Sequence, residues 1–299
     1  MSDEPKIRHV EGDGLRLRAL EWEMHARSGA ALLVHATSFC ADAWGPLWRE
    51  AREHGAAPLR GVAIDQRGHG GSDAPDDASA YQWTRLAADV AAVAARLAAE
   101  QPGARIVGVG HSSGAAALLA AAGLAPERFA ALVVIEPVLF EKPADPRAES
   151  FLGTRFLAGA ARRRRDRFAS LDEARERLRA KPPLAGFDAA VFDAILAGAL
   201  APAPDGGVAL RCPGEREAWC YEGAAALDLW PLIPHIRAPL LLVQGEHGAV
   251  APALRDRLVA ALPSVQSVSI PHATHFAALE RPREIGAALG AFLAECLRS

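Results

Sequence analysis

Cysteine is scarce in this chain and follows no spacing that is typical of a metal site. None of the four cysteines belongs to a Cys-x-x-Cys motif; they are Cys40, Cys212, Cys220 and Cys296. This argues against a zinc ribbon or a thiol redox centre, and in a reducing compartment such residues are expected as free thiols. We therefore expect no metal held by cysteine.

The chain also lacks an excess of one charge and any long apolar run. Its 33 Lys and Arg against 36 Asp and Glu give a formal net charge of −3. The chain thus lacks the excess of basic residues that is typical of nucleic-acid-binding proteins. The longest run of small apolar residues, 115–122, is far shorter than a membrane span. The first residues carry acids where a signal peptide carries basic residues. We expect a cytoplasmic protein without nucleic-acid or membrane partners.

Short apolar runs are what the chain does have. Residues 7–23 alternate apolar and polar side chains around a Gly-Asp-Gly turn, which predicts an antiparallel hairpin. The later runs show no polar alternation, as in strands buried on both faces of a parallel sheet. These runs are 31–34, 61–64, 105–109, 131–135, 240–243 and 265–270. The predicted fold class is therefore α/β, with helices on both faces of the sheet.

No comparable strand lies between residues 135 and 240, which indicates an insertion. We predict a core domain of residues 1–139 and 238–299 and a helical cap, or lid, of residues 140–237. Residues 170–173, Ser-Leu-Asp-Glu, resemble a capping box at the start of a cap helix. Residues 162–181 hold nine basic residues against four acids, and a solvated helix face explains them better than an anion site.

The clearest chemical signal is residues 110–114, Gly-His-Ser-Ser-Gly. An apolar strand leads into it and a helix of small residues leads out, as in a sharp turn that presents Ser112 at the carboxyl edge of the sheet. An ordinary helix N-cap is the structural alternative. A dinucleotide loop starting at Gly108 would need a third glycine where Ser113 stands, and is disfavoured.

A serine hydroxyl needs a base to become a nucleophile. Residues 271–276, Pro-His-Ala-Thr-His-Phe, follow the last predicted strand and place His272 and His275 in a loop at the same sheet edge as Ser112. Either histidine could serve on this evidence.

Three motifs in order resemble the α/β-hydrolase fold family: residues 65–72 (Asp-Gln-Arg-Gly-His-Gly-Gly-Ser), residues 110–114, and His275-Phe276 followed by residues 280–282 (Glu-Arg-Pro). The resemblance covers residues from about 30 to the end, apart from the insertion. It implies a mostly parallel eight-stranded sheet.

The same resemblance implies roles for single residues. Ser112 would be the nucleophile and His275 the base, with His272 an ordinary loop residue. The oxyanion hole would be formed by the backbone N–H groups of Ser113 and Thr37. For His35, and for the turn at residues 65–70, we prefer a structural role.

The third catalytic member is absent from its usual place, because the loop position where the family carries an aspartate holds Gly248. Glu136 ends the apolar strand 131–135 at the catalytic edge, where some family members, including a subset of haloalkane dehalogenases, carry their acid. A carboxylate there is costly unless it is paired or functional. We predict Glu136 as the acid; Glu246 and a Ser-His dyad remain open.

These residues predict a serine hydrolase that acts on a small-molecule carboxylic ester or lactone through an acyl-enzyme, with no metal or organic cofactor. Carbon–carbon bond hydrolysis, perhydrolysis and acyl transfer to another acceptor use the same residue types. A non-catalytic small-molecule receptor is the remaining alternative.

Overall fold

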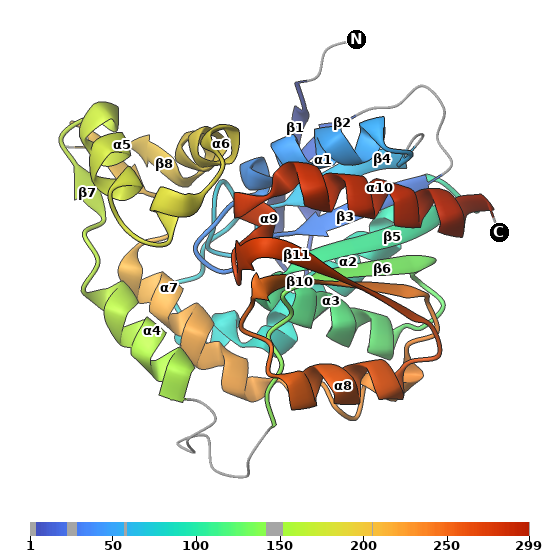
Figure 1. Ribbon diagram of the computed structural model, residues 1–299. Helices are drawn as coiled ribbons and strands as arrows, with labels where there is room; N and C mark the ends of the chain where they lie inside the picture. Colours follow the sequence, from blue (N-terminus) through green and yellow to red (C-terminus); the bar gives the residue numbers. More distant parts are fainter. Residues whose placement is uncertain (1–3, 23–28, 57–58, 142–151, 205, 299) are drawn as a thin grey trace.

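A computed structural model describes residues 4–22, 29–56, 59–141, 152–204 and 206–298. Its centre is an eight-stranded sheet with the order β1-β2-β4-β3-β5-β6-β10-β11 (Figure 1). The strands are β1 (Lys6–Glu11), β2 (Arg16–Trp22), β3 (Gly29–Val34), β4 (Leu59–Ile64), β5 (Arg105–His111), β6 (Ala131–Ile135), β10 (Leu240–His247) and β11 (Val265–Thr274).

The strand directions follow the sequence patterns. The alternating pair β1 and β2 is an antiparallel hairpin, and β2 also runs antiparallel to β4. The remaining pairs are parallel, and β3, β4 and β6 are buried along their whole length. This confirms the predicted α/β class, because strands covered on both faces cannot alternate apolar and polar residues.

Helices cover both faces of the sheet (Figure 1). One apolar cluster joins one sheet face to α2, α3 and α8, and a second joins the other face to α1 and α10. Residues 113–123 of α3 are all buried, which explains why that helix consists of small and apolar residues. The bounds are α1 (Trp44–Glu53), α2 (Trp83–Glu100), α3 (Ser113–Leu124), α8 (Pro252–Ala261), α9 (Ala277–Glu280) and α10 (Pro282–Arg298).

The segment between β6 and β10 forms a separate group of elements beside the carboxyl edge of the sheet (Figure 1). It contains α4 (Leu152–Arg162), β7 (Arg167–Phe168), α5 (Leu171–Arg179), α6 (Ala189–Ala199), β8 (Leu200–Pro202), β9 (Val208–Leu210) and α7 (Gly214–Glu222). We propose that residues 140–237 are a cap domain; residues 142–151 lie outside the described part of the chain.

A small antiparallel sheet in this segment, with the order β7-β9-β8, corrects the expectation of helices and loops alone. Strands of two or three residues are too short to show a period in the sequence. The start of α5 was predicted correctly, since the Ser170 hydroxyl accepts the N–H of Glu173 at 3.1 Å.

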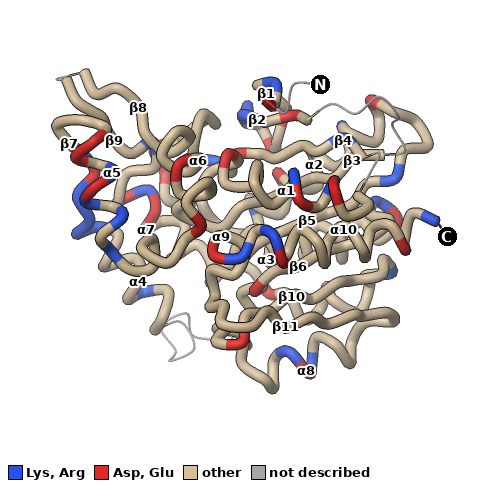
Figure 2. Tube along the Cα trace, turned by 45° about the horizontal axis from the view of Figure 1, so that its top comes forward, with Lys and Arg blue, Asp and Glu red and all other residues tan. Residues whose placement is uncertain are grey.

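Charged residues of both signs alternate around β7 and α5 (Figure 2). Arg162 pairs with Glu215 and Glu222, while Arg165 and Arg177 share Glu173. These arginines therefore have neighbouring acids as partners, as expected of a solvated face. Within the described ranges, no helix has both the length and the apolar character needed to cross a membrane.

Candidate active site

The turn between β5 and α3 consists of a single residue, Ser112. Its backbone angles are φ 54° and ψ −117°, a conformation that a residue other than glycine adopts only when its surroundings enforce it. Close packing provides that constraint: a Cβ on Gly114 would lie 2.3 Å from the carbonyl oxygen of Val34 in the neighbouring strand. The sharp turn predicted from residues 110–114 is therefore present, with Ser112 at the carboxyl end of β5.

His275 follows β11, and its imidazole reaches the serine. The distance from His275 Nε2 to Ser112 Oγ is 2.9 Å, within hydrogen-bond range. The side chain of His275 is 25% exposed, so one side of the ring remains open. By contrast, His272 is 79% exposed and interacts with Glu246.

Glu136 lies on the other side of the same imidazole, directly after β6. Its side chain is fully buried, and Oε2 is 3.3 Å from Nδ1 of His275. Two backbone N–H groups donate to the carboxylate: Gly245 to Oε1 and Ala249 to Oε2, each at 2.8 Å. Donors of this kind offset the cost of burying a carboxylate.

The backbone of Glu136 is also unusual, with φ 47°. Such conformations in residues other than glycine cost free energy and gather at functional sites. Ser112 and Glu136 therefore both leave their strands through strained turns at the same edge of the sheet. The backbone N–H of Ser112 donates to the carbonyl of Ile135 at 3.0 Å, which ties the two turns together.

Gly248 explains how the carboxylate fits. A Cβ built on Gly248 would lie 2.0 Å from Oε1 of Glu136. The position where the resemblance leads us to expect an aspartate is thus occupied in space by the carboxylate of another strand, and a side chain at residue 248 would collide with it.

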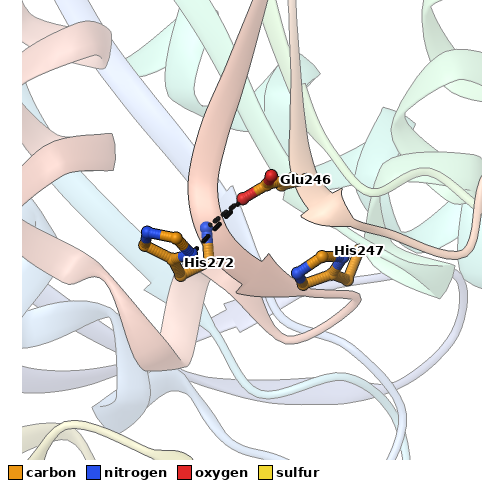
Figure 3. A group of neighbouring side chains, drawn as sticks. All are labelled: Glu246, His247 and His272. Atoms are coloured by element: carbon orange, nitrogen blue, oxygen red, sulfur yellow. Dashed lines mark hydrogen bonds and ion pairs between the residues drawn. The ribbon is translucent and has the colours of Figure 1, made fainter.

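Glu246, the second candidate acid, is directed elsewhere. It is exposed, and its Oε2 accepts the backbone N–H of His272 at 2.8 Å. That hydrogen bond lowers the pKa of the Glu246 carboxyl, and nearby His247 and His272 lower it further. Figure 3 shows Glu246 grouped with His247 and His272. The structure pairs His275 with Glu136 and not with Glu246.

The two residues predicted for the oxyanion hole lie side by side. The N–H of Thr37 donates to Oγ of Ser113 at 2.8 Å, and the hydroxyl of Thr37 donates to the same atom at 3.0 Å. The backbone N–H of Ser113 belongs to the first turn of α3, whose N–H groups lack helical acceptors. An oxyanion here could take the Ser113 N–H directly, but would compete with the Ser113 hydroxyl for the Thr37 N–H.

Two buried histidines hold the loop that carries Thr37. Nε2 of His35 accepts the N–H of Gln66 at 2.9 Å, and Nε2 of His69 accepts the N–H of Ser38 at 3.1 Å. Burial lowers the pKa of His35 to about 4. Burial, and next the proximity of His35, lower the pKa of His69 to about 3. Both imidazoles are thus neutral acceptors, in accord with the structural role preferred for His35.

The cap reaches this loop through α7. The hydroxyl of Ser38 donates to the carboxylate of Glu217 and lies 3.0 Å from the hydroxyl of Tyr221. Glu217 also forms an ion pair with Arg164. These contacts attach a cap helix directly beside Thr37.

Aromatic packing also joins cap and core next to the imidazole. Phe187 of the cap lies 5.7 Å from Phe39 and 5.6 Å from Phe276, measured between ring centroids. The Phe276 ring in turn packs edge-on against His275 at 5.4 Å. An apolar wall therefore flanks the base.

Sequence reasoning missed two supports of the histidine loop. Nε2 of His111 donates to the carbonyl of His275 at 2.9 Å, and Glu280 accepts both the N–H and the hydroxyl of Thr274, at 2.8 and 2.7 Å. Burial, followed by the effect of His275, lowers the pKa of His111 to about 3. The only sequence signal was position, since His111 precedes the serine and Glu280 belongs to the Glu-Arg-Pro motif.

Comparisons with known proteins agree with this architecture. The model of the alpha/beta hydrolase family matches residues 31–288. Epoxide hydrolase A of Mycobacterium tuberculosis is 35% identical over 150 residues, which are 48% of this chain and 41% of that protein. The similarity thus spans less than half of the relative's length.

Two solved structures resemble the whole fold. E-2-(acetamidomethylene)succinate hydrolase superposes with a TM-score of 0.79 at 22% identity, covering 97% of this chain and 99% of that one. A peroxisomal alpha-beta-hydrolase of Saccharomyces cerevisiae gives 0.80 at 20% identity, covering 99% and 89%. The family match over most of the sequence confirms the predicted resemblance: the chain belongs to the alpha/beta hydrolase family.

Proposed function

We propose that this chain is a serine hydrolase that cleaves a small carboxylic ester or lactone through an acyl-enzyme intermediate. The observation that supports this most is the continuous hydrogen-bonded series from Ser112 through His275 to the buried Glu136, with distances of 2.9 and 3.3 Å. A serine, a base and a carboxylate in this relation form an activated nucleophile.

In the proposed reaction, Oγ of Ser112 attacks the carbonyl carbon while Nε2 of His275 takes its proton. Glu136 holds the Nδ1–H of the ring and stabilises the imidazolium. The oxyanion accepts the Ser113 N–H, and that of Thr37 once the Ser113 hydroxyl rotates away. His275 then returns the proton to the leaving alcohol, and a water molecule activated by the same ring cleaves the acyl-enzyme. No step calls for a metal ion or an organic cofactor.

The nature of the nucleophile bears on the substrate class. If Ser112 attacked an epoxide carbon, it would form an ether, which this machinery cannot hydrolyse, whereas a carboxylate nucleophile forms an ester that water can cleave. Attack on an acyl carbon gives a hydrolysable ester of Ser112 itself. We therefore favour an acyl substrate over an epoxide, although one relative carries the name epoxide hydrolase.

Carbon–carbon bond hydrolysis, perhydrolysis and acyl transfer would use the same three residues and differ in the bond cleaved or in the acceptor. We also propose a cytoplasmic location with a small-molecule substrate. The free thiols of the described chain, three of them buried, suit a reducing compartment.

The test is the rate at which a fluorophosphonate probe adds to the protein, followed by intact mass. We expect one adduct on the wild type, none on Ser112→Ala, and addition at least about 100-fold slower on Glu136→Gln. Glu246→Gln is the matched control and should react like the wild type. Absence of an adduct on the wild type would favour the receptor alternative, and slowing in Glu246→Gln alone would assign the acid to Glu246.

A further inference from the structure

Three side chains of types that can ligate a metal ion gather outside the proposed catalytic triad of Ser112, His275 and Glu136. Glu246 and His247 end β10, and His272 lies near the end of β11. One potential ligand atom from each lies within 4.8 Å of the others, and all three residues are exposed. Figure 3 shows that the three side chains come from the ends of adjacent strands.

A bulge in β11 produces this grouping. Gly245 is in register with Ile270, but the next pair is His247 with Thr274. Two steps along β10 thus correspond to four along β11, and the additional residues are displaced from the ladder. His272 is one of them, and has φ 57°. Bulges commonly redirect a side chain near a functional site.

The hydrogen bonding of the bulge does not by itself account for two histidines and a glutamate at this place. Its displaced N–H, that of His272, needs one acceptor, and Oε2 of Glu246 provides it at 2.8 Å. Among the described residues Oε1 of Glu246 makes no further hydrogen bond. Neither imidazole is needed as a partner for the backbone groups of β10 and β11. Two imidazoles and a carboxylate oxygen are together a donor set that suits zinc.

The distances are compatible with one ion. Ligand atoms about 2.0–2.1 Å from a tetrahedral zinc lie roughly 3.3 Å from one another. Exposed side chains can close from 4.8 Å to that separation by rotating about their own bonds, because they are largely open to solvent: the side chains of His272 and Glu246 are 79% and 48% exposed.

We propose that Glu246, His247 and His272 bind one Zn²⁺ ion, with water as the fourth ligand. The site takes no part in the proposed hydrolysis. Two of its three ligands, Glu246 and His247, lie in the segment 245–249, in which the N–H groups of Gly245 and Ala249 donate to the Glu136 carboxylate. A bound ion would join this segment to β11 and stabilise the pair of loops against local opening.

Zinc titration of the untagged chain by calorimetry tests the site. We expect one ion per chain, and an affinity at least about tenfold weaker in each of Glu246→Gln, His247→Gln and His272→Asn, since even the loss of an outer-shell partner weakens metal binding that much. Glutamine at 246 keeps the acceptor for the bulge, and asparagine at 272 tolerates positive φ. These variants should therefore fold, as thermal melts without metal would verify.

Two controls separate this site from others. His9→Gln removes a histidine on β1, and His275→Asn removes the imidazole of the triad; both should bind zinc like the wild type. The thermal midpoint should rise with zinc in the wild type and the controls, but not in the ligand variants. Absence of binding by the wild type, or unchanged binding in a variant that combines Glu246→Gln, His247→Gln and His272→Asn, would overturn the proposal whether or not the chain is a hydrolase.

Discussion

At the scale of single residues, Glu136 and Gly248 depend on each other. The carboxylate of Glu136 fills the space where a side chain of residue 248 would be, since a Cβ at that position would lie 2.0 Å from Oε1. A chain that gained an aspartate at 248 while keeping Glu136 would place two carboxylates in one buried space, where both could not remain ionised. Glycine at 248 therefore leaves the space that the Glu136 carboxylate occupies, and the carboxylate in turn excludes a side chain at 248.

Gly248→Ala tests this dependence. The added methyl group should displace the Glu136 carboxylate from Nδ1 of His275 and slow fluorophosphonate addition about 100-fold, a loss that moving a catalytic group by about 1 Å can cause. Gly153→Ala is the matched control, because a Cβ there meets nothing within 4 Å. Addition at the wild-type rate in Gly248→Ala would mean that the carboxylate is not needed where the structure has it.

Ser113→Ala addresses the oxyanion hole. Without its hydroxyl, the N–H of Thr37 no longer donates to Ser113 Oγ and is free for the developing oxyanion. Relieving one such hydrogen bond should speed probe addition by roughly two- to tenfold, measured by intact mass at equal probe concentration. Slower addition would show instead that the Ser113 hydroxyl supports the reactive form of the loop.

At the scale of elements, α7 attaches the cap to the loop that carries Thr37. Glu217 of α7 is buried, accepts the hydroxyl of Ser38 and pairs with Arg164. Glu215, two residues earlier on the same helix, pairs with Arg162 at the surface. The same helix thus carries one acid that is buried and contacts the Ser38 loop, Glu217, and two exposed acids that pair with Arg162, Glu215 and Glu222.

Replacing Glu217 by alanine should therefore lower stability far more than replacing Glu215. The loss leaves Ser38 and Arg164 without their shared carboxylate, at a cost of about 2–3 kcal/mol of unfolding free energy, whereas an exposed pair contributes little. Urea unfolding of both variants measures the difference. Equal midpoints would imply that the contact between cap and loop carries no stability.

Some of the secondary-structure elements could be predicted from the sequence and others could not. The central strands and the hairpin were predictable because short runs of this kind carry a period or a continuous apolar character. Strand positions placed Ser112, Glu136 and the loop of His272 and His275 at one edge of the sheet. The choice of His275 as base and of Glu136 as acid rested on the resemblance to the α/β-hydrolase fold family and stays a prediction. The β7-β9-β8 sheet did not, since such short strands are defined only by their partners. The role of Gly248 and the rotamer of Ser113 depend on distances between segments remote in sequence.

At the scale of the whole molecule, three neutral histidines connect the loops at the carboxyl edge of the sheet. His35 and His69 join the Thr37 loop to the turn at residues 66–69, and His111 supports His275. His35 and His69 each accept a backbone N–H through Nε2, and His111 donates through Nε2 to a carbonyl, as a buried neutral imidazole can. The arrangement of the proposed active site therefore depends on rings that resist protonation.

This dependence predicts loss of stability in mild acid. The folded-state pKa values of His35, His69 and His111 are lowered to about 4, 3 and 3, below the value near 6.5 in an unfolded chain. Below about pH 6.5 the unfolded state therefore binds protons that the folded state does not, so this contribution to stability is complete above that pH and decreases as pH falls. Three such groups lose roughly 4 kcal/mol between about pH 7 and 5.5.

The urea midpoint should therefore fall as the pH is lowered across that range. His69→Gln keeps an acceptor for the Ser38 N–H. It should reduce the slope of stability against pH by about one third, because one of the three protons no longer contributes. His54→Gln, which replaces an exposed histidine, is the matched control for the loss of one imidazole. A wild-type midpoint that did not move over this pH range would mean that these loops accept charged imidazoles, and that burial does not keep the three rings neutral.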